Sequence, residues 1–321
     1  MGSKYDEINL SGLKRLSIKD RTSMVNAEQF GKAPAAGRSF AEFLNSIPNI
    51  LAGSSLRELV FAIACARRAE KPVIACMGAH VIKCGLSPVI IELMSNKILT
   101  AVAMNGAGAI HDAEVALFGS TSEDVASGLK NGTFGMAFET AEFLNQAAVV
   151  AHQQGLGLGE SIGKALLEAK APNTKLSIQA SGYSLGIPVT IHVALGTDIT
   201  HMHPSADGAA YGDATMRDFR ILTYAMKDLG QGGVLLNFGS AVVLPEVVLK
   251  AFAILRNLGF DFSGTVGANF DFIQQYRSTQ QVVKRIEYLG GKGYALTGHH
   301  EIMIPLLAHA VMEELGKGEQ P

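Results

Sequence analysis

The chain has 321 residues, which is long enough to form a hydrophobic core. Of these residues 48% are hydrophobic and 17% charged, a composition that excludes a disordered protein. The formal net charge of −2, from 27 basic and 29 acidic residues, provides no long-range field for nucleic acid or an anionic membrane. We therefore expect no nucleic-acid partner and no membrane partner.

Residues 1–40 are polar and irregular, and they end in "GKAPAAGRS". We interpret them as an N-terminal arm that packs on the domain or on a partner subunit, followed by a single α/β domain over residues 41–321. The N-terminus has no apolar signal segment and no uninterrupted run of 18 apolar residues occurs, so we expect a cytoplasmic protein that does not span a membrane. Three cysteines without CxxC spacing indicate neither disulfides nor a zinc site.

From residue 54 the chain alternates helical and strand patterns. The first helix has a capping box, Ser55 to Glu58, followed by apolar residues at helical spacing. Short apolar runs that follow the helices read as buried strands. The predicted helices cover 54–70, 85–97, much of 134–170, 215–230, 244–259 and 299–315, and the predicted strands cover 71–78, 98–108, 187–195, 232–241 and 260–269.

This alternation predicts a Rossmann-like, doubly wound parallel sheet with helices on both faces. In such sheets ligands bind outside the carboxyl ends of the strands. Glycine and polar residues gather at four predicted strand ends, which suggests one shared pocket. These ends are "MGAHVIKCG" (77–85), "NGAGAIHDAE" (105–114), "GTDITHMHP" (196–204) and "NFGSAVVLPE" (237–246).

The turn that starts at Asn105 follows a strand and opens a helix. Its small residues would let backbone N–H groups approach a phosphate or a ribose at the helix N-terminus, and His111, Asp112 and Glu114 add polar contacts. The alternative is a tight turn in which Asp112 favours the helix dipole. By contrast, "GLGLGESIG" (155–163) follows a helical segment, so we interpret it as a connection between helices and not as a dinucleotide loop.

His201 and His203 could supply two imidazoles to a metal, with Asp198 or Asp207 as a carboxylate ligand. A catalytic zinc normally takes three protein ligands, and the sequence identifies no third histidine with suitable spacing. We therefore expect no metal and assign His201 and His203 to the substrate pocket.

The segment "MGAHVIKCGLSPVIIELMSNKILTAVAMNGAGAIHDAEVAL" resembles the deoxyhypusine synthase family. The resemblance continues in "IPVTIHVALGTD", "GGVLLNFGSAVV", "RNLGFDF" and "IMIPLLAHAVMEEL", and covers roughly residues 55–315. It implies a Rossmann-like, NAD-binding fold and a homotetramer with active sites between subunits. Members of the family oxidise spermidine, and an active-site lysine carries the aminobutyl group before it passes to a lysine of a translation factor.

The resemblance also implies positions for the site. It places the catalytic lysine near Lys284 and an acidic substrate-binding residue near Asp271. The implied NAD-binding residues are Asn105, Gly106, Ala107, Gly108, Asp112, Asp198, Gly239 and Ser240.

The chain departs from the family pattern at several positions, and two of these departures concern the catalytic residues. Lys284 follows Val282-Val283 where the family has Trp-Gly, and Leu244-Pro245-Glu246 stands where the family has Lys-His-His. We therefore expect an NAD-dependent enzyme that acts on an amine or a small polar metabolite and differs from deoxyhypusine synthase. The resemblance implies a transferase of the aminobutyl-transfer type. Two alternatives remain: a non-catalytic paralogue that binds NAD or another ligand, and a metal-dependent enzyme that uses His201 and His203.

Overall fold

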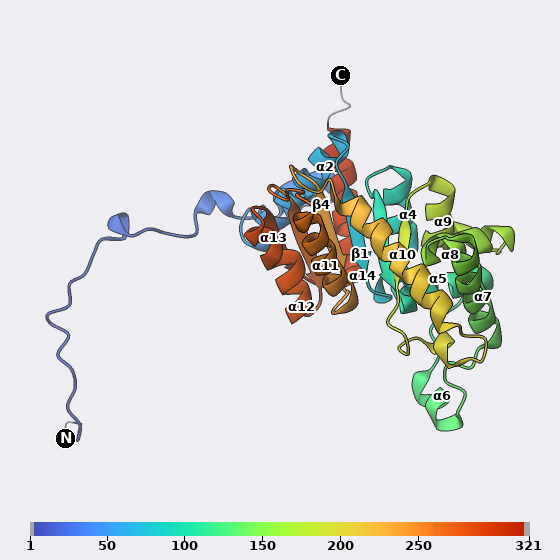
Figure 1. Ribbon diagram of the computed structural model, residues 1–321. Coiled ribbons are helices and arrows are strands. Elements are labelled where there is room, and N and C mark those ends of the chain that lie inside the picture. Colours follow the sequence, from blue (N-terminus) through green and yellow to red (C-terminus); the bar gives the residue numbers. More distant parts are fainter. Residues whose placement is uncertain (1–2, 318–321) are drawn as a thin grey trace. The chain divides into compact units, whose positions relative to one another are not determined.

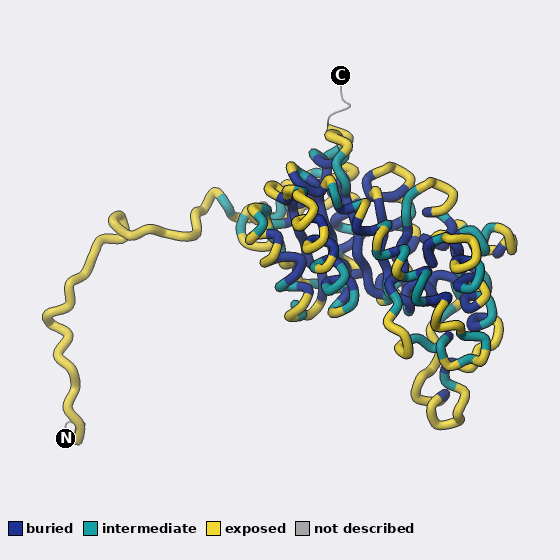
Figure 2. Tube along the Cα trace, viewed as in Figure 1, coloured by how far each residue is buried: buried dark blue, intermediate teal, exposed yellow. Residues whose placement is uncertain are grey.

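The computed structural model describes residues 3–317, and the chain divides into two compact units, one up to Ser54 and one from Ser55 onward. The first unit has two short 3-10 turns, η1 (Ile18–Asp20) and η2 (Ala27–Gln29), and the helix α1 (Phe40–Ser46). Residues 3–28 are exposed throughout, as Figure 2 shows. Ser39 and Glu42 form a capping box at the start of α1.

The second unit is built on one sheet of six parallel strands in the order β3-β2-β1-β4-β5-β6. The strands are β1 (Val73–Met77), β2 (Ala101–Asn105), β3 (Val189–His192), β4 (Val234–Phe238), β5 (Val266–Asp271) and β6 (Lys292–Thr297). The order reverses between β1 and β4, so the carboxyl ends of these two strands form the topological switch point of the sheet.

Helices cover both faces of the sheet (Figure 1). The helices from α2 onward are α2 (Ala52–Arg68), α3 (His80–Lys83), α4 (Ser87–Ser95), α5 (Gly106–Phe118), α6 (Val125–Asn131), α7 (Phe138–Gln154), α8 (Leu158–Glu168), α9 (Ile178–Leu185), α10 (Gly208–Met226), α11 (Val243–Asn257), α12 (Tyr276–Ser278), α13 (Arg285–Tyr288) and α14 (His300–Gly316). The 3-10 turns η3 (Thr174–Leu176) and η4 (Ile199–Met202) and the π-helical segment η5 (Thr279–Lys284) complete the unit.

The main core lies between the sheet and the helices α10 and α11. Ile74 and Cys76 of β1 and Leu235 of β4 pack there against Leu222 of α10 and Val248 of α11, and all five are fully buried. Since side chains alternate between the two faces of a strand, the fully buried Val73, Ala75 and Met77 face the opposite side, the side that α4, α5 and α14 cover. The predicted doubly wound α/β sheet is therefore confirmed.

Local differences from the sequence prediction have simple causes. The second helix begins at Ala52, so Ser55 lies inside it and the predicted capping box with Glu58 does not form. The predicted connection at 155–163 is confirmed, because Gly155 ends α7 in a left-handed conformation and Gly157 precedes α8. Among residues 3–317, the structure contains no helix with the length and apolar character needed to cross a membrane.

Candidate functional site

The carboxyl end of β2 brings five of the predicted NAD-binding residues together. Asn105 is the last residue of β2 and the N-cap of α5, where its Oδ1 accepts a hydrogen bond of 3.0 Å from the Gly108 amide. A Cβ on Gly106 would overlap the carboxylate of Asp198, so only glycine lets this carboxylate approach the first turn of α5. The sequence therefore correctly anticipates that the turns after β2 and β3 meet.

Asp198 is positioned by the loop that follows β3. His201 Nδ1 accepts hydrogen bonds from the amides of Gly196 and Asp198, both at 3.2 Å, and this closes the loop over α5. Burial raises the pKa of Asp198, and the nearby His201 partly opposes that shift. A carboxylate at this place can accept hydrogen bonds from hydroxyl or ammonium groups of a ligand.

A cavity of about 260 Å³ opens beside this turn. It is lined by residues of α5 and of the segments 122–137 and 197–199, together with Lys83 of α3. Three carboxylates border it, those of Glu114, Glu123 and Asp198, and the imidazole of His111 lies among them. One cationic side chain against three acidic ones gives the lining an excess of negative charge.

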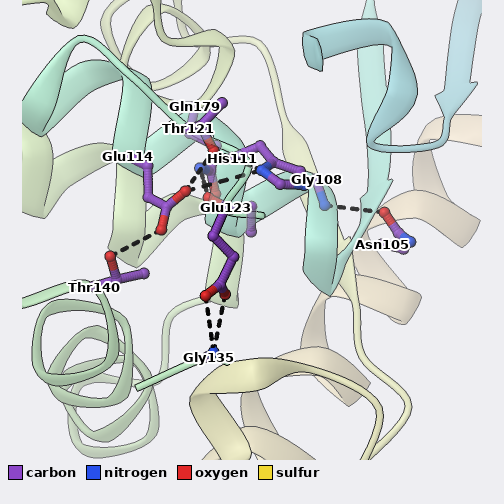
Figure 3. Close-up of polar contacts among 10 residues, drawn as sticks. Asn105, Gly108, His111, Glu114, Thr121, Glu123, Gly135, Thr140 and Gln179 are labelled. Carbon is purple, nitrogen blue, oxygen red and sulfur yellow. Dashed lines mark hydrogen bonds and ion pairs between the residues drawn. The ribbon is translucent and has the colours of Figure 1, made fainter. Parts of the chain in front are cut away.

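A hydrogen-bonded chain fixes the orientation of His111 (Figure 3). The Thr121 hydroxyl donates its proton to Glu114 Oε2, and the Thr140 hydroxyl donates to Glu114 Oε1 at 3.0 Å. Since Thr121 has no second proton, its contact of 2.6 Å with His111 Nδ1 requires that Nδ1 carries the hydrogen. The Nε2 atom of neutral His111 is then the acceptor of the ring.

The environment of His111 favours its neutral form. Burial is the main cause that lowers its pKa, Lys83 adds to this effect, and Glu114 opposes it. A neutral imidazole with a fixed tautomer can accept a proton from a ligand, which is the role of a general base.

The turn around Gly135 closes another side of the cavity. Its amide donates to both carboxylate oxygens of Glu123 at 3.0 and 3.1 Å, as Figure 3 shows, and its carbonyl accepts a hydrogen bond of 2.8 Å from His203 Nε2. Gly135 has a φ of +72°, and a Cβ there would overlap Met202. His203 thus holds the Gly135 turn and is not itself part of the cavity lining.

His201 and His203 do not converge on a common point. His201 Nδ1 binds two amides, and His203 Nε2 binds the Gly135 carbonyl. Asp207 caps α10 by accepting from the amides of Ala209 and Ala210 at 2.8 and 3.1 Å. Within residues 3–317, no three histidine, cysteine or acidic side chains are arranged to hold a metal ion.

Asp112 lies in the interior, away from the cofactor pocket in which the sequence places it. It is fully buried, and it accepts hydrogen bonds from Ser177 Oγ at 2.6 Å, from the Ile178 amide at 2.8 Å, and from the amide and the side chain of Gln179 at 3.1 Å. Burial raises its pKa, and these hydrogen bonds oppose the shift. In this arrangement Asp112 anchors the start of α9.

Gly239 and Ser240 lie at the end of β4, at the topological switch point. The Gly239 amide donates to the Phe270 carbonyl at 3.0 Å, and Ser240 Oγ accepts from the Leu244 amide at 3.2 Å. Gly239 has a φ of +69°, and a Cβ there would overlap His300. β1 lies between β2 and β4, so this turn is about 10 Å from the Asn105 turn at the usual strand spacing.

Asp271 and Lys284 are not brought together within the chain. Asp271 ends β5, where it is buried and accepts from the Phe272 amide at 2.8 Å. Lys284 lies on η5, and the Val282 carbonyl of η5 packs against Gly267 of β5. Gly267 and Asp271 are four residues apart on β5, which corresponds to roughly 13 Å along the strand. The Lys284 side chain is 50% exposed, and its amine pairs with Glu287 at 3.0 Å.

Among the titratable lining residues, Lys83 and Glu123 are not anticipated by the sequence, and His111 and Glu114 are named there only as polar contacts of the turn. The helical period is the signal that identifies His111 and Glu114. Ala107, His111 and Glu114 are four and three residues apart, so they share a face of α5, whereas Asp112 is turned by about 100° from His111. If Ala107 lines the pocket, the helical period predicts that His111 and Glu114 line it as well.

No protein-family model and no curated protein sequence matches the chain. Solved structures do. A ternary complex of AgrE with ornithine and NAD+ has a TM-score of 0.55 and 12% identity over 82% of this chain and 33% of that one, so this chain spans about a third of its length. A proposed deoxyhypusine synthase from Entamoeba histolytica has a TM-score of 0.51 and 12% identity over 86% of this chain and 94% of that one. The chain has a deoxyhypusine synthase-like fold.

The edge of the sheet in this deoxyhypusine synthase-like fold suits an extended dinucleotide. The turns at Asn105 and Gly239 are spaced across β2, β1 and β4, and the glycines there make room for the Asp198 carboxylate and the His300 ring. The carboxylate of Asp198 at the first turn of α5 would repel a pyrophosphate there, but it suits the hydroxyl groups of a ribose. The residues present therefore fit NAD, with a ribose at Asp198.

Proposed function

We propose that this chain is an NAD-dependent enzyme that acts on a small amine, with His111 as its general base. The observation that carries the proposal is the 260 Å³ cavity, in which three carboxylates surround an imidazole whose Nδ1 is already hydrogen-bonded. An excess of carboxylates favours a cationic ligand over an anionic one. The AgrE structure with ornithine and NAD+ supports the same combination of an amine and NAD on this fold.

The residues of the chain have separate tasks in this proposal. Glu123 binds and orients the ammonium group of the substrate, and Asp198 accepts a hydrogen bond from a ribose hydroxyl of NAD. His111 Nε2 removes a proton from that nitrogen, and the Thr121–Glu114 chain holds the ring and stabilises the imidazolium that forms. NAD, when bound, supplies a hydride acceptor for the carbon next to the nitrogen. Loss of one proton from the nitrogen and one hydride from the carbon leaves an iminium ion as the product, and the hydride and the proton leave the substrate separately.

A second candidate function is a ligand-binding paralogue without group transfer. The observation that favours it is Lys284, which is half-exposed and paired with Glu287 instead of lying beside Asp271. The aminobutyl-transfer step of the deoxyhypusine synthase family would need this lysine to reach a substrate from a neighbouring subunit. Borohydride trapping with amines and NAD, followed by peptide mapping, should label Lys284 if transfer occurs.

Cofactor binding and chemistry can be tested separately. Calorimetry should detect NAD binding, and Asp198→Ala should weaken it about tenfold because a charged hydrogen bond to the ligand is lost. NADH formation with a panel of small amines should fall 10²- to 10⁴-fold in His111→Gln, the usual contribution of a general base. His152→Gln is the control, because His152 is a half-exposed histidine on α7 that pairs with Asp213.

Two results would contradict the proposal. Folded protein that shows no heat with millimolar NAD would exclude the cofactor. Full amine oxidation by His111→Gln would exclude His111 as the base. NAD binding without turnover of any amine would favour the ligand-binding paralogue.

A further inference from the structure

A second cavity, of about 270 Å³, lies beside the amino end of β3. It is formed by α8, α9, α10 and the first residues of β3, and it shares no lining residue with the cavity beside α5. β3 is an edge strand, so its outer backbone groups face these helices and not another strand. None of the residues around it belongs to the proposed NAD and amine site.

Asp218 of α10 is a buried carboxylate in the wall of this cavity. Its Oδ2 accepts hydrogen bonds from the Gly159 amide at 2.9 Å and from the Ile191 amide at 2.8 Å, so it joins the start of α8 to the outer edge of β3. Its Oδ1 has no hydrogen-bond partner within the described residues. A buried acceptor without a partner is unusual in a folded protein.

Gln179 of α9 provides a second acceptor of this kind. Its Nε2 donates to Asp112 Oδ2 at 3.1 Å and to the Ala109 carbonyl at 3.3 Å, and this orients the amide group. Its Oε1 is buried and has no hydrogen-bond partner among residues 3–317. Two buried side chains that line one cavity therefore each keep an acceptor for which the protein supplies no donor.

The charge and the walls of the cavity indicate what could supply these donors. Glu160 adds a second carboxylate, and the lining contains no lysine, arginine or histidine. The remaining wall is largely apolar and includes Pro188, Val189 and Ile221. An anion would meet two carboxylates and no cationic side chain here, whereas an ammonium group on a short apolar chain would match both the charge and the apolar wall of the lining.

We propose that this cavity binds a small alkylammonium ion. Its N–H groups donate to Asp218 and Gln179, Glu160 adds charge at the entrance, and the alkyl chain packs on Val189 and Ile221. The proposal is independent of the amine chemistry assigned to His111. The titratable groups that face Asp218 from neighbouring elements are Glu160 of α8 and Tyr183 of α9, and β3 contributes none to the lining.

The test is calorimetry of the full chain with n-butylammonium chloride at pH 8, with n-butanol as a neutral probe of similar shape. We expect one binding event in this cavity and at least tenfold weaker binding of n-butanol. Glu160→Gln should weaken n-butylammonium binding several-fold, and Asp218→Asn should weaken it tenfold or more. Glu160 is an exposed residue, so its variant folds even if loss of the Asp218 carboxylate disturbs α8.

Matched controls locate the site. Glu168→Gln changes the same charge on the same helix, but Glu168 is not part of the lining, and it should leave binding unchanged. Amide chemical shifts should move at Gly159 and Val189 on titration. Equal affinity for n-butanol, or unchanged affinity in Glu160→Gln, would overturn the proposal. Shifts confined to Ala107 and His111 would also overturn it, and would instead support the proposed amine site.

Discussion

At the scale of single residues, burial lowers the pKa of His111 and Glu114 opposes this shift. Glu114 favours the protonated imidazole, whereas burial and Lys83 favour the neutral one. Replacing Glu114 with glutamine removes the opposing charge, so the His111 pKa should fall further. The acid limb of the kcat/KM profile for amine oxidation should then move to lower pH. Thr140→Val is the control, since it removes one hydrogen bond to Glu114 but keeps the charge. An unchanged limb in Glu114→Gln would contradict this role.

Asp218 makes stability depend on pH. Burial is the main cause that raises its pKa from 3.8 to about 7, and Glu160 adds to the shift. The folded chain therefore keeps a proton that the unfolded chain loses near pH 4. The resulting stabilisation is complete below pH 4 and is lost as the pH rises through 7. Between pH 5 and pH 8 this group should cost roughly 3 kcal/mol of unfolding free energy.

Asn at position 218 has no charge to titrate and keeps one acceptor for the Gly159 and Ile191 amides. Urea unfolding of Asp218→Asn should therefore depend less on pH between 5 and 8 than that of the wild type. Asp228→Asn, at an exposed carboxylate just beyond α10, should follow the wild type. Parallel pH profiles for Asp218→Asn and the wild type would show that Asp218 titrates near its ordinary value.

At the scale of elements, α9 depends on a residue of another helix. Asp112 of α5 receives four hydrogen bonds from Ser177, Ile178 and Gln179 at the start of α9. Asp112→Ala would leave these buried donors without a partner, at a cost of about 3 kcal/mol in unfolding free energy. Denaturant unfolding measures this loss, and calorimetry with NAD should show unchanged affinity in the folded variant. Weaker NAD binding at unchanged stability would return Asp112 to the cofactor pocket.

The sequence predicts the positions of β1 to β4, begins β5 six residues too early and misses β6. β1, β2 and β4 are buried over nearly their whole length, and apolar residues make up most of each strand. β6 is missed, because at the edge of the sheet its residues are exposed or half-buried except for Leu296. The short helix α9 is also missed, since it is held by Asp112 from a distant part of the chain, a contact that local spacing does not show.

In the candidate site, too, local sequence patterns predict some residues, whereas the role of others depends on contacts between distant segments. The Asn105 turn and Asp198 are predicted because glycine and polar residues at strand ends are visible in the sequence. His111 is mentioned there only as a polar neighbour, because its role depends on Thr121 and Glu114 being folded against it. The cavity walls from Glu123 and Gly135 depend on a loop packing that no sequence pattern encodes.

At the scale of the whole molecule, the exposed apolar side chains of the first unit require an explanation. Ile8, Leu10, Leu13 and Leu16 are between 60% and 85% exposed. A series of large apolar side chains in water indicates a surface that contacts another protein. Together with the resemblance to a tetrameric family, this leads us to propose that the segment takes part in assembly of a homotetramer.

Light scattering of the full chain should give about four times the mass of one 33.9 kDa chain. The double substitution Leu13→Ser and Leu16→Ser should lower the measured mass at micromolar concentration, because burial of each leucine contributes about 2 kcal/mol to association. Lys14→Ala with Arg15→Ala alters the residues between them and keeps the apolar side chains, so it should preserve the assembly. A wild-type chain that is monomeric at every concentration would contradict the assembly. A tetramer that both variants leave intact would place the subunit contacts on the α/β unit instead.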